Sequence, residues 1–257
     1  MHFTPATAAT ILAFASSALA APYSSTTGST SPHAAQTSTA APAPAPSLSL
    51  TQQLFLSDTA ADRFKLLPDD KQFVFDFNQP QNGAGEGGEL VAANRKSFPA
   101  LVGTGAGMAV GTVEKCGMNT FHVHPRSAEL QIVVKGRLIT EMTPENGVFE
   151  ADGVTRRVIR TELGPFQMTP FYQGSLHTQF NPDCEDAIFV ASFAAEDFGT
   201  GQVADSTFAL SDDVIAATFG QSIAGADIDR VRKAIPKSIA LGVDECLKKC
   251  NIKKRSL

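Results

Sequence analysis

Three histidines and one glutamate, gathered in two short segments, have the types and spacing of metal ligands. Residues two apart in an extended strand share a face, so His122 and His124 point the same way. Glu129 follows after a short turn and can open the next strand beside them, while His177 comes after a tight turn at Gly174. Imidazole nitrogens with one carboxylate oxygen suit Mn, Fe, Ni, Cu or Zn. The sequence therefore predicts one divalent ion held by His122, His124, Glu129 and His177.

Three amide side chains follow these residues at the same two-residue period. Gln131 lies two residues after Glu129, and Gln179 and Asn181 lie two and four residues after His177, so all three should face inward with the ligands. Gln131 and Gln179 are candidates to hydrogen-bond the ligands or a bound oxyanion. The alternative is that they are ordinary polar residues at the mouth of a barrel.

The elements that must position these residues are mostly short strands. Apolar runs separated by turn residues recur from Glu89 to Phe193, a spacing typical of a β-sandwich or barrel. Alternating phenylalanines over 73–77 predict a further strand before them. The expected fold class is therefore all-β, a barrel followed by C-terminal helices. Caps, breakers and helical spacing predict helices over 59–67, 211–219, 226–235 and 243–250.

Composition divides the chain into three parts. Residues 1–20 lack acidic groups, carry an apolar run and end in Ala-Leu-Ala, as a secretory signal peptide does. Residues 21–50 are rich in Ser, Thr, Ala and Pro, which predicts a disordered linker. Residues 51–257 are expected to fold as one domain, with its helical tail from about 205. We expect a secreted, extracellular protein; the alternative is a disordered Ala-rich start of a cytosolic protein.

The charge of the chain argues against two classes of partner. Its 257 residues carry a net charge of -5, which gives no basic surface of the kind that nucleic acid or an anionic membrane attracts. After the first twenty residues no stretch approaches the ~20 apolar residues that cross a bilayer. We expect no nucleic-acid and no membrane partner. Basic residues over 248–255 are expected to form a solvated terminus, with cell-wall contact as the alternative.

The four cysteines are candidates for disulfides, because export leads to an oxidising environment. If the strands that carry His122 and His177 pair, opposed residue numbers sum to nearly 300, as those of Cys116 and Cys184 do. These two cysteines are therefore expected to face each other and could bridge. Cys246 and Cys250 lie one helical turn apart and are poorly aimed at each other, so bridges from the tail to the barrel remain an alternative.

The first histidine segment resembles the cupin superfamily, and within it the secreted germin-like and spherulin-like proteins. The first cupin motif runs from a Gly through His-x-His and Glu to a second Gly. His122, His124, Glu129 and Gly136 match it, while Cys116 stands at the position of the leading Gly.

The second segment resembles the second cupin motif, which runs from a Gly through Pro-x-Gly and His to Asn. Gly174, His177 and Asn181 match it, while Phe166 stands at the first Gly and Tyr172 at the Pro. The resemblance covers about residues 60–245 with one pair of motifs. It implies a single-cupin chain with a jelly-roll barrel.

The resemblance also implies a cofactor, activities and an assembly. The ion in germin-like proteins is commonly manganese, and their activities include superoxide dismutase and oxalate oxidase. Oxalate oxidases carry Asn side chains before the first motif, and the stretch 102–107 here has none, so dismutation or another small-molecule oxidation is favoured. The alternative is a non-enzymatic, spherulin-like structural or stress-associated protein. The C-terminal helices are expected either to assemble homo-oligomers, from dimer to hexamer, or to pack on the chain's own barrel.

Overall fold

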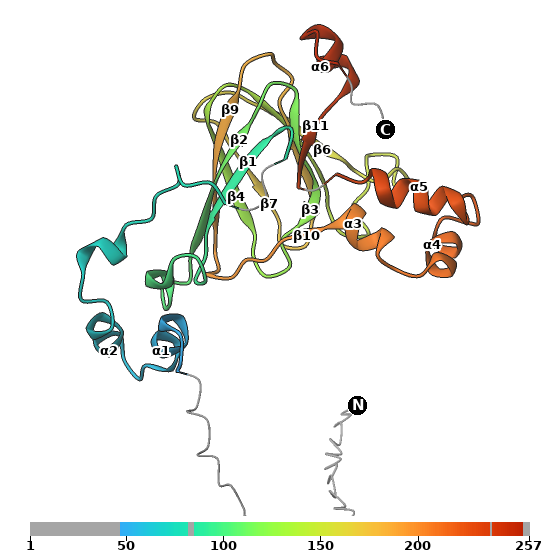
Figure 1. Ribbon diagram of the computed structural model, residues 1–257. Coiled ribbons are helices and arrows are strands. Elements are labelled where there is room, and N and C mark those ends of the chain that lie inside the picture. Colours follow the sequence, from blue (N-terminus) through green and yellow to red (C-terminus); the bar gives the residue numbers. More distant parts are fainter. Residues whose placement is uncertain (1–46, 82–84, 237, 254–257) are drawn as a thin grey trace, which may run out of the picture. The chain divides into compact units, whose positions relative to one another are not determined.

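Two antiparallel β-sheets form the body of the protein (Figure 1). The computed structural model describes residues 47–81, 85–236 and 238–253, so the expected signal peptide and nearly all of the expected linker lie outside the described residues. The strands are β1 (Gly88–Ala93), β2 (Gly107–Val113), β3 (Gly117–Val123), β4 (Glu129–Lys135), β5 (Leu138–Thr143), β6 (Ile159–Leu163), β7 (Met168–Phe171), β8 (Leu176–Phe180), β9 (Ala187–Phe193), β10 (Gly201–Gln202) and β11 (Ile239–Leu241).

Helices occupy both ends of the described chain. They are α1 (Leu50–Leu56), α2 (Ala60–Lys65), α3 (Val203–Phe208), α4 (Asp212–Thr218), α5 (Ala226–Ala234) and α6 (Asp244–Lys249), with 3-10 helices η1 (Asp70–Phe73) and η2 (Pro99–Leu101). The expected mixture of strands followed by C-terminal helices is confirmed. Among the described helices, none is long and apolar enough to cross a membrane.

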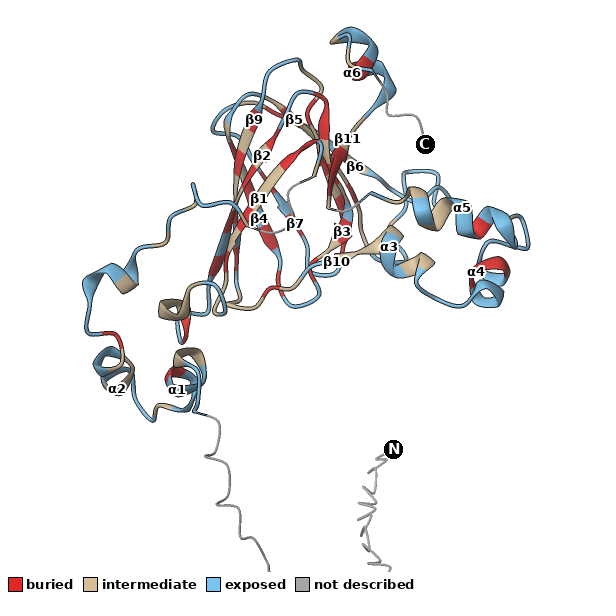
Figure 2. Ribbon diagram, in the orientation of Figure 1, coloured by how far each residue is buried: buried red, intermediate tan, exposed pale blue. Residues whose placement is uncertain are grey.

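Strand order is β1-β2-β9-β4-β7 in the first sheet and β10-β3-β8-β5-β6 in the second. Side chains that alternate inward along β4, β5 and β9 meet between the sheets, where Val133, Leu138 and Phe189 are almost completely buried (Figure 2). The arrangement is consistent with the expected jelly roll, although the strands pair as two sheets and not as one continuous barrel.

The outer edge of β3 is covered by two short strands from the C-terminal part of the chain. In β10, Gln202 pairs with His122, and in β11, Ile239 pairs with Asn119. An open strand edge would present unpaired N–H and C=O groups. The two strands therefore protect the strand that carries the first histidine, and β11 brings α6 to one end of the sheets.

The helical tail packs partly on itself. Ile215 of α4 and Ile228 of α5 are buried in one cluster, whereas Val214 and Phe219 stay exposed. The predicted helices correspond to α2, α4, α5 and α6 to within a few residues, whereas α1 and α3 have no counterpart among them.

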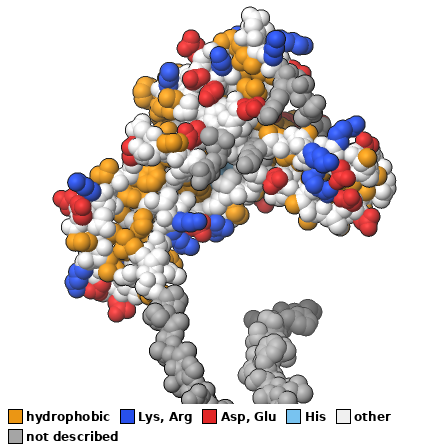
Figure 3. All heavy atoms as spheres, in the orientation of Figure 1, with side chains coloured by type: hydrophobic (Ala, Val, Ile, Leu, Met, Phe, Trp, Pro, Cys, Tyr) orange, Lys and Arg blue, Asp and Glu red, His pale blue; other side chains and the backbone are white. Residues whose placement is uncertain are grey.

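The predicted strand over 73–77 is wrong. A capping box between Asp69 and Gln72 starts the short helix η1 instead, and the following residues form no strand. The phenylalanines pack as aromatic pairs in a loop, with Phe75 against Phe77 at 4.8 Å and against Phe98 at 5.4 Å between ring centroids. Other apolar side chains of this N-terminal segment are exposed, namely Phe55, Leu56, Phe64 and Val74. Figure 3 shows hydrophobic atoms spread over the segment.

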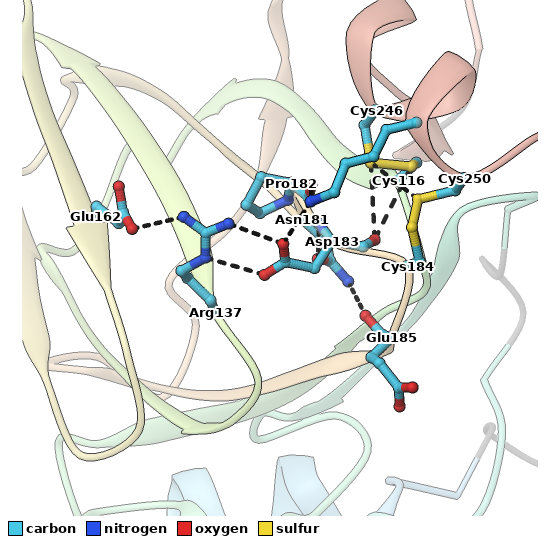
Figure 4. A network of polar contacts seen from close by, with 11 residues as sticks. Cys116, Arg137, Glu162, Asn181, Pro182, Asp183, Cys184, Glu185, Cys246 and Cys250 are labelled. Carbon is cyan, nitrogen blue, oxygen red and sulfur yellow. Dashed lines mark hydrogen bonds and ion pairs between the residues drawn. A yellow bond between two sulfur atoms is a disulfide. The ribbon is translucent and has the colours of Figure 1, made fainter.

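The disulfide pairing differs from the one that strand register favoured. Cys116 bonds Cys246 and Cys184 bonds Cys250 (Figure 4). Cys116 and the Cys184 loop are neighbours as expected, because the Cys116 N–H donates to the Asp183 carbonyl. However, α6 lies next to this loop. Cys246 within α6 and Cys250 at its C-cap are one turn apart, and each bonds one of the two cysteines from the strand region.

Candidate metal centre

The four predicted ligands converge between the sheets. His122 lies near the end of β3, and His124 follows directly after that strand. Glu129 is the first residue of β4, and His177 lies on β8 opposite His122. All four side chains are buried, and one ligand atom from each lies within 4.8 Å of the others. Because β4 belongs to the other sheet, the cluster joins the two sheets through Glu129.

Backbone carbonyls fix the orientation of each imidazole. The Nδ1 atoms lie 2.7 Å from the Thr120 oxygen for His122, 2.6 Å from the Gly199 oxygen for His124, and 2.9 Å from the Ser175 oxygen for His177. A carbonyl only accepts, so each Nδ1 carries the proton and donates it. In a neutral ring the Nε2 lone pair is then free for a metal, which is the arrangement that outer hydrogen bonds commonly impose on metal-binding histidines.

Aromatic rings hold two of the imidazoles in place. The ring of Phe171 stacks on His177 with 4.2 Å between centroids, and Phe193 meets His124 edge-on at 4.8 Å. These contacts limit the rotation of the imidazoles, so the ligand atoms are positioned before any ion arrives.

The contacts of Glu129 indicate that a cation belongs in the cluster. Its Oε2 lies 2.9 Å from Nε2 of His124 and 3.3 Å from Nε2 of His177. With Nδ1 protonated in both rings, each contact joins two lone-pair atoms unless a proton or a metal ion shares them. One divalent ion would satisfy all four groups, so the donor set fits the metal that the sequence predicts.

Two members of the cluster, His122 and Glu129, have lowered pKa values. Burial, reinforced by the neighbouring His177, lowers the pKa of His122 to about 3, because the charged imidazolium is poorly solvated there. Burial alone would raise the pKa of Glu129, but the contacts of its carboxylate with His124 and His177, which favour the ionised form when either ring shares a proton with it, outweigh burial and lower the pKa to about 2. A neutral imidazole beside an ionised carboxylate is the protonation state that binds metal.

We expect His122 to remain neutral in the metal-free protein from pH 8 to about pH 4. Because the folded pKa is about 3 and the unfolded value about 6.5, the unfolded chain binds a proton over this window that the folded protein does not. Stability should therefore fall as the pH falls from 6.5 toward 3, and His122→Gln should remove part of that slope. NMR titration of the His122 ring checks the assignment, and a midpoint near pH 6 would contradict it.

The two predicted outer amides bond each other instead of the ligands. Gln179 Nε2 donates to Gln131 Oε1 at 2.7 Å, and both side chains are buried. Asn181, which was expected to face inward with them, donates from Nδ2 to three backbone carbonyls, including that of Glu185 at 2.6 Å. Its role is to hold the turn after β8.

Sequence reasoning missed Asn119. It lies three residues before His122, so a regular strand would turn it to the opposite face. A β-bulge between Asn119 and His122 inserts one extra residue into β3 and returns Asn119 to the inner face. Its Oδ1 is buried without a hydrogen-bond partner. A bulge leaves no periodic signal, so only the polar residue near the motif could have suggested this position.

A small cavity of about 100 Å³ lies beside the cluster. His122, His124 and Glu129 form part of its wall, and Asn119, Thr200 and Gln202 supply its other polar groups. The remaining lining is apolar and comes from β1, β2, β9 and Phe198. A larger cavity of about 420 Å³ near the N-terminal segment contains none of the four ligands.

Comparison with known families agrees with the motifs. The model of the cupin family matches residues 75–225. The chain belongs to the cupin family. Spherulin-1A of Physarum polycephalum is 36% identical to this cupin over 203 residues, which cover 78% of each chain, and Spherulin-1B of the same organism is 37% identical over 202 residues. A probable germin-like protein of Arabidopsis thaliana is 28% identical over 63% of this chain and 72% of its own.

Solved structures show the same fold at lower identity. A structure of oxalate oxidase in complex with the substrate analogue glycolate has a TM-score of 0.57 and 19% identity, and covers 65% of this cupin and 81% of that chain. An oxalate decarboxylase structure has a TM-score of 0.51 and covers 62% of this cupin and 39% of that chain. These structures show the shared fold, while the family model and the relatives from Physarum and Arabidopsis support a germin- and spherulin-like cupin.

The two residues that replace motif glycines adopt backbone conformations that favour glycine. Cys116 has φ 55° and Phe166 has φ 63°. Cys116 is held there by its disulfide. Phe166 follows Pro165 in a tight turn in which the Gln167 N–H donates to the Gly164 carbonyl. The cupin motif therefore has glycine at these two positions because the backbone is left-handed there, and in this chain Cys116 and Phe166 adopt the same conformation.

Phe166→Gly is expected to stabilise the protein by about 0.5–1 kcal/mol. Left-handed backbone costs a residue with a Cβ about 1–2 kcal/mol, and glycine returns about 0.5–1 kcal/mol of this through its greater freedom when unfolded. The Phe166 side chain is 79% exposed, so little burial is lost. Denaturant unfolding measures the gain. Met108→Gly, at a partly exposed position within the regularly paired strand β2, is the control and should destabilise.

Proposed function

We propose that this cupin binds one manganese ion through His122, His124, Glu129 and His177 and acts as a secreted oxidoreductase on a small molecule, with superoxide dismutation as the favoured reaction. The observation that carries the proposal is the convergence of a buried carboxylate and three oriented imidazoles within 4.8 Å. A bound manganese ion would supply one-electron redox chemistry. The backbone carbonyls and aromatic rings hold the ligands, and the apolar wall limits the entry of water.

The cavity favours a very small substrate. Its volume of about 100 Å³ is well below the ~300–1,000 Å³ of pockets for drug-sized ligands. No Lys or Arg is among its lining residues, so a dianion such as oxalate finds no cationic side chain there. A divalent ion with one carboxylate ligand leaves a single positive charge, which suits a monoanion such as superoxide. Asn119 nevertheless places one amide in the wall of this cavity, so oxalate belongs in the assay.

The test is metal analysis of the purified protein followed by assays with superoxide and with oxalate. We expect about one manganese per chain, superoxide dismutation, and loss of both in His122→Ala. Oxalate consumption without dismutation would support the metal centre and replace the favoured reaction. A protein that binds no divalent ion would rule out the proposal.

The second candidate function is non-enzymatic. The spherulin relatives match 78% of this chain, at higher identity than the germin-like relative, and two disulfides tie the C-terminal helix to the sheets. These observations favour a durable structural or stress-associated extracellular protein. Stoichiometric metal with no turnover of either substrate, together with resistance to heat and protease, would select this function.

Export and self-association are further parts of the proposal. Both disulfides suit an extracellular protein. Exposed Val214 and Phe219 of the helical tail could contact a second copy, and light scattering on the secreted protein tests this directly. Cell-wall contact through the basic residues near the C-terminus is tested by binding to wall polysaccharide, with lysine-to-glutamine variants at 248 and 249 as the control.

A further inference from the structure

Three buried amides lie in the layer next to the candidate metal centre, and each has one unsatisfied atom. Among the described residues, the buried side-chain atoms without a hydrogen-bond partner are Asn119 Oδ1, Gln131 Nε2 and Gln179 Oε1. The exposed fractions of these side chains' residues are 3%, 0% and 0%. Buried polar groups without partners are rare in proteins, so three in one place indicate a common partner.

The three amides follow the same strands as the ligands. Asn119 shares β3 with His122, Gln131 lies two residues after Glu129 on β4, and Gln179 lies two residues after His177 on β8. These three residues, called the amide trio below, therefore form a second buried layer on the strands that carry His122, Glu129 and His177.

The members of the trio are close enough to share one small partner. Asn119 and Gln179 are directly opposed across β3 and β8, where Cβ atoms are ~5 Å apart. Gln179 Nε2 donates to Gln131 Oε1 at 2.7 Å, which connects the two sheets. Once this bond is made, the glutamine atoms without a partner are one amide nitrogen, which donates, and one amide oxygen, which accepts. If the nitrogen and oxygen positions were swapped in both side chains, one nitrogen and one oxygen would still be left.

We propose that the amide trio binds one water molecule. The unsatisfied groups are one donor, Gln131 Nε2, and two acceptors, Asn119 Oδ1 and Gln179 Oε1. Water can accept one hydrogen bond and donate two, so it satisfies all three atoms. A hydroxyl group donates only one hydrogen bond and an oxyanion donates none. The trio is therefore a water site, and not the oxyanion site that the positions of the two glutamines first suggested.

The water has a positioning role. It connects β3, β4 and β8 beside the three strand-borne ligands, and Asn119 also lines the cavity next to the cluster. Outer contacts of this kind typically change metal affinity by about 10–100-fold when they are lost. This role depends on the proposed function only in that the four ligands bind an ion; the water itself does not require turnover.

The first test is a crystal structure of the protein at a resolution that shows ordered water, with and without manganese. We expect one water within hydrogen-bond distance of Asn119 Oδ1 and of both glutamine amides in both structures. An empty site, or amides turned so that each finds a protein partner, would overturn the inference. Failure to bind metal would overturn the proposed function and leave this test intact.

The second test separates positioning from simple stability. The double variant Gln131→Met/Gln179→Met removes both glutamine amides while keeping side-chain length. Only Asn119 Oδ1 of the trio then lacks its partner, so the unfolding midpoint should fall slightly. Its manganese affinity, measured by competition with a chelator, should fall about tenfold. Thr140→Val is the matched control, because Thr140 is buried opposite Gln179 but bonds Thr161 at 2.7 Å, and its affinity should change less than about twofold. Unchanged affinity in the double variant would refute the positioning role.

Discussion

Replacement of His122 by alanine is expected to weaken metal binding by more than about 100-fold, beyond the range that outer-shell changes cause. The substitution removes one of three Nε2 donors from a buried site whose Glu129 lies within 3.3 Å of the other two imidazoles. His177→Ala should have the same effect from the opposite strand. Metal content after gel filtration measures the loss, which should be nearly complete at micromolar metal.

Thermal unfolding gives an independent measure of the same loss. A ligand that binds only the folded state raises its stability, so manganese should raise the Tm of the unsubstituted protein and leave that of His122→Ala unchanged. Thr200→Ala is the matched control, because Thr200 lines the same cavity and belongs to no ligand set. Full metal content in both histidine variants would show that the ion is bound at a site other than the four candidate ligands.

The candidate ligands could be predicted from the sequence because their geometry is local. His122 and His124 share a face through the two-residue period of a strand, and the register of β3 against β8 brings His177 opposite His122. Asn119 could not be predicted in this way, since one bulge residue reverses its face. The mutual hydrogen bond of Gln131 and Gln179 joins opposite sheets, so it depends on the distance between the sheets and not on either strand.

The cysteines show where strand register alone fails. Register correctly placed Cys116 beside the loop that contains Cys184, but the short strand β11 was not predicted, and it is β11 that brings α6 to the same place. Two cysteines one helical turn apart were poor partners for each other, and each instead reaches one barrel cysteine. A long-range pairing of three residues carries little periodic signal, so this rearrangement could be seen only in the structure.

Opening the buried disulfide is expected to have the second large effect. Cys116→Ala/Cys246→Ala should lower the free energy of unfolding by about 2–5 kcal/mol. This bridge closes a loop of 130 residues, whereas Cys184–Cys250 closes a loop of 66. Each doubling of loop length adds about 0.6 kcal/mol to the closure entropy that a bridge removes from the unfolded chain. Cys184→Ala/Cys250→Ala is therefore the matched control and should cost less.

The surroundings of the two bridges reinforce this difference. Cys116 and Cys246 are buried and pack with Leu247, whereas Cys184 is exposed at the surface. The Asp183 carboxylate also binds Arg137 at 2.8 Å (Figure 4). Lys249 of α6 lies 3.1 Å from the same carboxylate, so α6 keeps polar contacts with this loop when Cys184–Cys250 opens. Hydrogen bonds from Arg137 are the main reason that the pKa of Asp183 is lowered to about 2, so these contacts persist in mild acid.

Graded reduction should therefore open the two bridges in a fixed order. Attack by a thiolate requires access to a sulfur, and the exposed Cys184 offers it while the inner pair does not. Alkylation and peptide mapping should find Cys184 and Cys250 modified at reductant concentrations that leave Cys116–Cys246 intact and the protein folded. The second step should coincide with loss of structure, because it frees α6 and with it β11, whose release uncovers the edge of β3 beside Asn119. Modification of Cys116 before Cys184, or equal stability of the two double-alanine variants, would show that the buried bridge does not clamp the C-terminal segment.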